Sequence, residues 1–122
     1  MKRVAVLLAA LVLAVLFPHA SAEPWALEWE QDVGPGYITT SPLVDEERVY
    51  VRTSGFWTGE ERPEVMAFTH LGVLEWSYSS PTTVQHDMAP MLKVEAGSGP
   101  CGSWPDLLLV GWADGALSLI HI

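Results

Sequence analysis

The sequence predicts an all-β fold, a β-propeller of four-stranded antiparallel blades with about two blades present. After residue 22, Gly and Pro recur every few residues and separate short runs rich in Val, Leu, Tyr, Phe and Trp. Short strands at this spacing are typical of sandwiches, barrels and propellers. A repeat favours the propeller, because 47 residues separate Trp29 from Trp76 and 48 separate Pro42 from Pro90. That interval is the size of a four-stranded blade.

The first 22 residues have the pattern of a secretory signal peptide. Lys2 and Arg3 are followed by 14 apolar residues, 4–17, and small residues occupy positions 20–22. The apolar run is shorter than the roughly 20 residues that a membrane span needs. We therefore expect cleavage after Ala22 rather than a retained anchor, with the mature chain secreted or held in the cell envelope. Residues 23–122 would form the partial propeller.

The predicted mature chain is strongly acidic. Its 100 residues contain 15 Asp and Glu against four Lys and Arg, a formal net charge of −11. Nucleic acids and anionic membrane surfaces repel such a chain, which leaves other envelope or extracellular proteins as the expected partners. Cys101 is the only cysteine, so the chain cannot form an internal disulfide.

Five short segments have the composition of strands. The first is Arg48–Arg52, which has a β-prone centre between charged ends, and the others are 65–68, 73–78, 107–110 and 116–120. The run 107–110 is continuously apolar, which predicts a strand buried on both faces. Asp114 and Gly115 predict a tight hairpin turn. The segments 54–63 and 94–105 have the composition of surface loops.

Three stretches resemble the pyrroloquinoline-quinone-like β-propeller repeat family. Ala67 to Trp76 resembles the family's tryptophan-docking turn, 41–51 resembles its next two strands, and 110–117 resembles its Asp-Gly hairpin. The resemblance covers about 25–119. It implies that Trp29 and Trp76 wedge between blades, that Gly72 permits the docking turn, and that Ala67 belongs to the same motif. Thr69 stands where the family usually has Asp, which implies a weaker docking hydrogen bond.

The number of visible blades implies a longer protein. A propeller needs at least four blades to close its ring, and only about two are evident. A lone pair would leave sheet faces and edge strands open. We therefore expect this chain to be the N-terminal part of a longer polypeptide.

The residues predict no catalytic, cofactor-binding or metal site. The three histidines after residue 22 (His70, His86 and His121) lack paired ligand spacing. The acidic run 45–47 lies at a predicted hairpin and lacks the alternating pattern of a calcium loop, so a solvated turn is the favoured interpretation. Trp57 and Trp104 lie on predicted loops and are the candidates for stacking on a ligand.

Two classes of function remain open. The favoured one is a non-catalytic interaction scaffold. The alternative is a quinone- and calcium-dependent dehydrogenase, or a ligand-binding surface sensor. Pyrroloquinoline quinone and calcium would be cofactors only in the enzyme. The resemblance implies an adjacent-cysteine disulfide in many such enzymes, and one cysteine excludes it within this chain. Quinone binding also requires cationic and amide side chains, which are scarce here.

Overall fold

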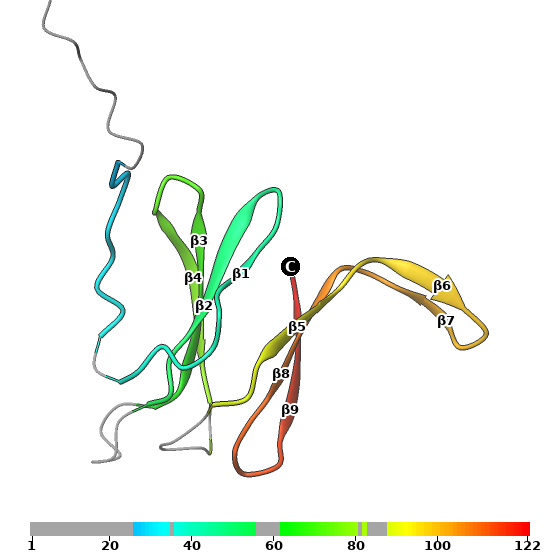
Figure 1. Ribbon diagram of the computed structural model, residues 1–122. Helices are drawn as coiled ribbons and strands as arrows, with labels where there is room; N and C mark the ends of the chain where they lie inside the picture. Colours follow the sequence, from blue (N-terminus) through cyan, green and yellow to red (C-terminus); the bar gives the residue numbers. More distant parts are fainter. Residues whose placement is uncertain (1–25, 35, 56–61, 81, 83–87) are drawn as a thin grey trace, which may run out of the picture.

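The computed structural model describes residues 26–34, 36–55, 62–80, 82 and 88–122. All regular structure in these residues is β: a four-stranded sheet, a three-stranded sheet and a two-stranded ribbon (Figure 1). Every strand pair is antiparallel. The predicted all-β class is therefore confirmed. The described residues include no helix that is long and apolar enough to cross a bilayer. The predicted signal peptide and Trp57 lie outside these residues.

The first sheet is a meander in chain order. It consists of β1 (Leu43–Val44), β2 (Arg48–Arg52), β3 (Glu64–Thr69) and β4 (Leu74–Ser79). Tyr50 of β2 pairs with Leu43 of β1 on one side and with Ala67 of β3 on the other. Alternation of side chains along each strand gives this sheet two different faces. The strands predicted over 48–52, 65–68 and 73–78 agree with β2, β3 and β4 to within one residue at every end.

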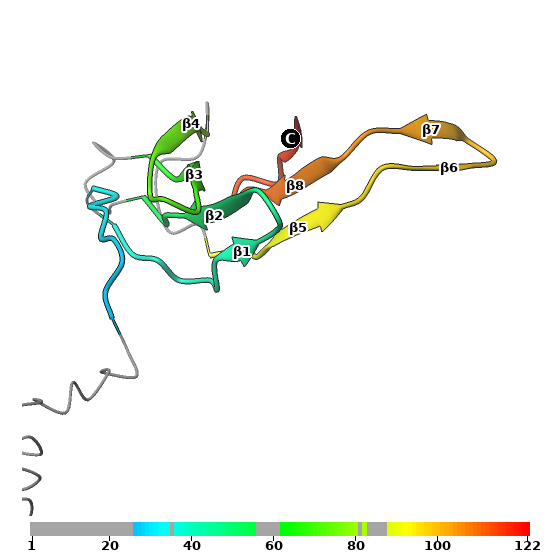
Figure 2. The ribbon, with the colours of Figure 1, turned by 90° about the horizontal axis from the view of Figure 1, so that it is seen from above.

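The second sheet has three strands, with a ribbon inserted between the first two. Its strands are β5 (Met91–Val94), β8 (Leu107–Gly111) and β9 (Leu117–His121), paired in that order. The ribbon, β6 (Gly97–Gly99) and β7 (Gly102–Trp104), projects away from both sheets in the two views (Figures 1 and 2). The loop predicted over 94–105 is therefore wrong in part, because six of its residues pair as strands, although nearly all of the ribbon is exposed.

One hydrophobic core joins the facing sides of the two sheets. Tyr50, Val65 and Ala67 of the first sheet pack with Leu108 and Val110 of the second. Burial alternates along β8, where these two residues are buried while Leu107 and Leu109 are only half-buried. The expectation that this strand is buried on both faces is therefore wrong. One face of the second sheet packs on the first, and the other turns away from it.

The opposite face of the first sheet has a thinner cover. Val51, Met66 and Phe68 form a second apolar cluster there, and Val33 packs against it. The Trp29 ring stacks on Phe68, with 6.1 Å between ring centroids. The segment that carries Trp29 and Val33, residues 26–34, runs beside the first sheet on the side away from the second (Figures 1 and 2). This segment forms no strand.

Arg52 ties the two sheets together. This residue is 1% exposed, and its Nη1 and Nη2 donate hydrogen bonds to the carbonyls of Ala89 and Gly111, at 2.5 and 2.7 Å. Its guanidinium carbon lies 4.8 Å from the centre of the Trp112 ring. A buried charge is costly unless hydrogen bonds compensate for its lost hydration. The two carbonyls and the aromatic ring supply that compensation across the sheet interface.

Candidate functional site

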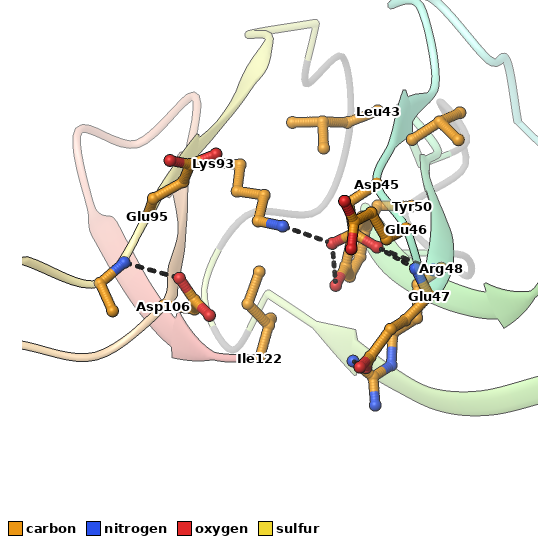
Figure 3. A pocket seen from close by; sticks show the side chains of 12 residues that line it. Leu43, Asp45, Glu46, Glu47, Arg48, Tyr50, Lys93, Glu95, Asp106 and Ile122 are labelled. Atoms are coloured by element: carbon orange, nitrogen blue, oxygen red, sulfur yellow. Dashed lines mark hydrogen bonds and ion pairs between the residues drawn. The ribbon is translucent and has the colours of Figure 1, made fainter.

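A polar cleft lies where the β1–β2 turn meets β5 and the start of β8. Its volume is about 890 Å³, and it opens to solvent (Figure 3). Most of the side chains that line it are charged. They are Asp45, Glu46, Glu47, Arg48, Lys93, Glu95 and Asp106, together with the polar Tyr50 and the apolar Leu43, Val44, Ala96 and Ile122. The cleft draws on both sheets, so the sheet interface shapes it.

Asp45 organises this cleft. Its Oδ1 accepts hydrogen bonds from the backbone amides of Glu47 and Arg48, at 2.9 and 2.8 Å, which closes the β1–β2 turn. This use of an aspartate is typical of tight turns. Its Oδ2 accepts from the Tyr50 hydroxyl at 3.2 Å and from Lys93 Nζ at 2.8 Å, the second from the other sheet (Figure 3).

The prediction that residues 45–47 form a solvated turn is therefore only partly correct. Glu46 and Glu47 are exposed, as expected, but Asp45 is partly buried. Both of its carboxylate oxygens already accept hydrogen bonds from protein donors. Sequence reasoning missed this function, since the decisive partner, Lys93, lies 48 residues away along the chain.

The environment holds these groups in their ordinary charge states. Burial raises the pKa of Asp45, but hydrogen bonds from Lys93 and from two backbone amides lower it by more, so the carboxyl pKa falls below its usual range. The hydrogen bond to Asp45 raises the pKa of Lys93. Burial is the main cause that raises the pKa of Tyr50. At neutral pH the cleft therefore holds a carboxylate, an ammonium and a neutral phenol, which suit an ion pair better than proton transfer.

The lowered pKa of Asp45 predicts a specific acid sensitivity. A carboxyl group with a lower pKa in the folded state stabilises the fold above its unfolded pKa, about 4, and loses that contribution as pH falls below it. We expect the Asp45→Asn variant to be less stable at pH 7 and to lose less stability than the parent chain on acidification. Urea unfolding at neutral and acidic pH measures the free energy of unfolding of each protein and so checks both expectations. The exposed neighbour Glu46→Gln is the matched control. Parallel pH curves for parent and Asp45→Asn would contradict the prediction.

No metal site is evident in the described part of the chain. Among residues 26–34, 36–55, 62–80, 82 and 88–122, no three His, Cys, Asp or Glu side chains converge to hold an ion. His70 Nε2 lies 2.9 Å from the carbonyl oxygen of Asp45, which makes it part of the turn packing. His121 is exposed on β9, and His86 lies outside the described residues.

The structure brings Trp29 and Gly72 together. Trp29 Nε1 donates to the His70 carbonyl at 3.0 Å, and its ring lies on the β3–β4 turn, residues 69–73, here called the docking turn. Gly72 has φ +79°, and a Cβ built there would lie 2.8 Å from Trp29 ring atoms. Glycine is therefore required both for its backbone conformation and for the closeness of the indole.

Thr69 supports the docking turn in place of the aspartate that the resemblance implied. Its Oγ1 accepts hydrogen bonds from the amides of Leu71 and Val73, at 3.3 and 3.1 Å. Its carbonyl accepts from the amide of Gly72 at 2.9 Å. A hydroxyl with two lone pairs can accept from both amides, so Thr69 gives the turn a side-chain cap.

Ala67 and Trp76 lie outside the docking turn that contains Gly72. They are opposite one another on β3 and β4, and Trp76 packs against the core between the sheets. Its ring centroid lies 6.0 Å from that of Tyr50. Trp29 and Trp76 thus lie on opposite faces of the first sheet: Trp29 covers its outer face, and Trp76 packs against the core between the two sheets.

The other predicted residues lie in turns and in the ribbon. Asp114 and Gly115 form the turn between β8 and β9, where Gly115 has φ +88° and Asp114 Oδ1 accepts from the Ala116 amide. The Trp104 ring lies against Gly97, and Trp104 Nε1 donates to the Glu95 carbonyl at 3.0 Å. The residue is 38% exposed. Cys101 is exposed in the turn of the ribbon.

Arg52 is the other position whose role the sequence interpretation misses. The sequence predicts it only as a charged end of a strand. The available signal was its spacing, because it lies two residues after Tyr50 and so on the same face of β2. That face packs on the second sheet.

Comparison with known proteins places the chain in no group. No protein-family model matches it, and no curated protein sequence matches it.

Proposed function

We propose that this chain is an exported β-propeller repeat protein of the pyrroloquinoline-quinone-like type and that it acts as a non-catalytic interaction scaffold. The observation that carries the proposal is that both carboxylate oxygens of Asp45 already accept hydrogen bonds from the protein. The polar cleft between the two sheets has at its centre a carboxylate whose two oxygens accept hydrogen bonds from four protein donors. Such a group fixes a turn and joins two sheets, and this favours a structural role for the cleft.

The propeller part of the proposal is supported by the direction in which the sheets stack. Trp29 packs on the outer face of the first sheet, and Trp76 packs into the core that the second sheet contributes to. If the two tryptophans are equivalent, the outer face of the first sheet corresponds to the inner face of the second. Both sheets then face the same way. Successive blades of a propeller are related in this manner, whereas a face-to-face sandwich reverses one sheet.

The β6–β7 ribbon is the favoured contact for an envelope or extracellular protein. It projects from the sheets, so a partner can reach both of its edges (Figure 2). Its Trp104 side chain is fixed by the Glu95 hydrogen bond and by Gly97, yet more than a third of the residue is exposed. A rigid, half-exposed indole loses little conformational entropy on binding, which is the reason tryptophans dominate the energetics of many interfaces.

The test compares binding with catalysis. The exported protein is used as bait in an envelope extract, beside a Trp104→Ala bait and a Leu71→Ala control that alters an exposed apolar residue in the docking turn. We expect a stoichiometric protein partner that is retained by the Leu71→Ala bait and lost, by at least about tenfold, with Trp104→Ala. The same preparations are assayed for dye reduction with added quinone, calcium and simple alcohols. Quinone-dependent turnover would contradict the scaffold proposal.

A further inference from the structure

The β6–β7 ribbon has no charged residue and a single aromatic one. Residues 97–104 are Gly-Ser-Gly-Pro-Cys-Gly-Ser-Trp. Gly97 and Gly99 are alternate residues of β6, so they lie on the same face of that strand. Trp104 of β7 pairs with Gly97 and therefore projects from this face as well. The ribbon thus presents one large side chain beside a strand that has no side chains of its own on that face.

The Trp104 ring lies along these two glycines. A Cβ built on Gly97 would be 2.9 Å from Cζ2 of the ring, and one built on Gly99 would be 3.5 Å from Cη2 and Cζ3. The six-membered part of the indole therefore covers β6 with one face. Because the residue is 38% exposed, the other face is the part left to solvent. The hydrogen bond from Nε1 to the Glu95 carbonyl keeps the ring in this position.

Carboxylates flank the ribbon at its base. Glu95 precedes β6 and Asp106 follows β7, where Asp106 Oδ1 accepts from the Ala96 amide at 2.6 Å. The exposed Glu95 side chain forms no ion pair or hydrogen bond with any residue that the structure describes. The nearest cation along the chain, Lys93, is bound to Asp45 of the first sheet at 2.8 Å (Figure 3). The base of the ribbon is therefore negatively charged.

An aromatic face beside carboxylates is suited to a cation. Among aromatic side chains, tryptophan attracts cations most strongly to its ring face, and nearby carboxylates add to that attraction. Arginine fits better than lysine, because its planar guanidinium stacks on aromatic rings. The molecule already contains one such pair, since the guanidinium carbon of Arg52 lies 4.8 Å from the centre of the Trp112 ring.

We infer that Trp104 binds an arginine side chain of the partner protein. The inference rests on the scaffold function proposed above and adds the chemistry of the partner, whose contacting segment is basic. The guanidinium lies on the solvent-facing side of the Trp104 ring, and the Glu95 carboxylate forms an ion pair with it. An acidic segment would be repelled by the same carboxylates.

A titration with a short arginine peptide tests the inference without the partner. The probe is Gly-Arg-Gly-Arg-Gly with blocked ends, and the NMR signals of the Ser98 and Ser103 backbone amides follow its binding. We expect saturable binding that Trp104→Ala weakens at least about fivefold, and no binding of the peptide with Glu in place of Arg. Glu95→Gln, which keeps the carbonyl that holds Nε1, should weaken binding by about twofold. The same spectra report whether each variant keeps the native fold.

Two glycine substitutions separate the position of the ring from its presence. A Cβ at Gly97 would collide with the ring at 2.9 Å, whereas one at Gly99 would make an ordinary contact at 3.5 Å. Neither glycine has a positive φ, so alanine fits the backbone at both. Gly97→Ala should therefore displace the ring and weaken peptide binding about as much as Trp104→Ala does. Gly99→Ala is the matched control and should leave the affinity unchanged.

The outcomes distinguish this inference from the scaffold proposal. Equal affinity of the parent and Trp104→Ala for the arginine peptide, or equal binding of the Glu peptide, would overturn the inference. The arginine peptide is also added to the envelope pull-down, where it should displace the partner. A partner that requires Trp104 but is not displaced would contradict the inference and leave the scaffold proposal intact. Peptide binding at Trp104 without any captured partner would support the arginine site and count against the scaffold proposal.

Discussion

Replacing Arg52 with alanine is expected to lower the free energy of unfolding by about 3 kcal/mol, a large share of the stability of a domain of this size. The substitution removes both hydrogen bonds that cross the sheet interface and leaves the carbonyls of Ala89 and Gly111 without these donors. It also removes the guanidinium that lies against Trp112. The melting temperature should fall by roughly 12 °C or more.

Two variants show whether this loss is specific to Arg52. Arg52→Lys keeps the charge but cannot present two donors in a fixed fork, so it should recover only part of the stability. Arg48→Ala, which removes ion pairs to Glu47 and Glu75 near the surface, should cost less than about 1 kcal/mol. Chemical denaturation measures the free energy of unfolding of all three variants. If Arg52→Ala cost no more than Arg48→Ala, Arg52 would not hold the sheets together.

Substitution of Gly72 with alanine is expected to have the next largest effect. The left-handed backbone there costs a residue with a Cβ about 1–2 kcal/mol. The new Cβ would also lie 2.8 Å from the Trp29 ring, too close for that ring to stay on the docking turn. We therefore expect a greater loss of stability than backbone strain alone, together with a change in the near-ultraviolet signal of tryptophan.

Gly115→Ala separates the two contributions. Gly115 has φ +88°, yet a Cβ there meets nothing within 4 Å, so its substitution measures the strain alone. In a Trp29→Ala background the clash is absent, and Gly72→Ala should then cost about as much as Gly115→Ala. This double-mutant cycle isolates the contact between Gly72 and Trp29. An unchanged cost in the two backgrounds would mean that the contact contributes nothing.

The strands were largely predictable from sequence because the relevant signals are local. Alternating β-prone residues mark β2, and Asp114-Gly115 marks the turn between β8 and β9. The ribbon escaped prediction because its Gly, Ser and Pro composition is that of a loop. Its two strands do pair, and the Trp104 ring packs against Gly97. Composition reports what a segment prefers alone, whereas strand pairing also depends on cross-strand contacts such as the one between Trp104 and Gly97.

The contacts between the sheets were not predictable, since each joins distant segments. Arg52 finds its acceptors 37 and 59 residues along the chain. Asp45 meets Lys93 only when the two sheets face one another. A charged residue at a strand end looks the same in a sequence whether it is solvated or buried. The burial of Arg52 follows from the direction in which the sheets stack, which no local pattern specifies.

The crystal structure of the protein tests the central proposal most directly, through the arrangement of its sheets. We expect antiparallel sheets set around a common axis and facing the same way, with β1 and β5 innermost and Arg52 between the first sheet and the second. Trp29 should lie on Gly72 at the docking turn. A closed barrel, or a sandwich in which the second sheet is reversed so that Leu109 rather than Val110 faces the first sheet, would contradict the propeller proposal.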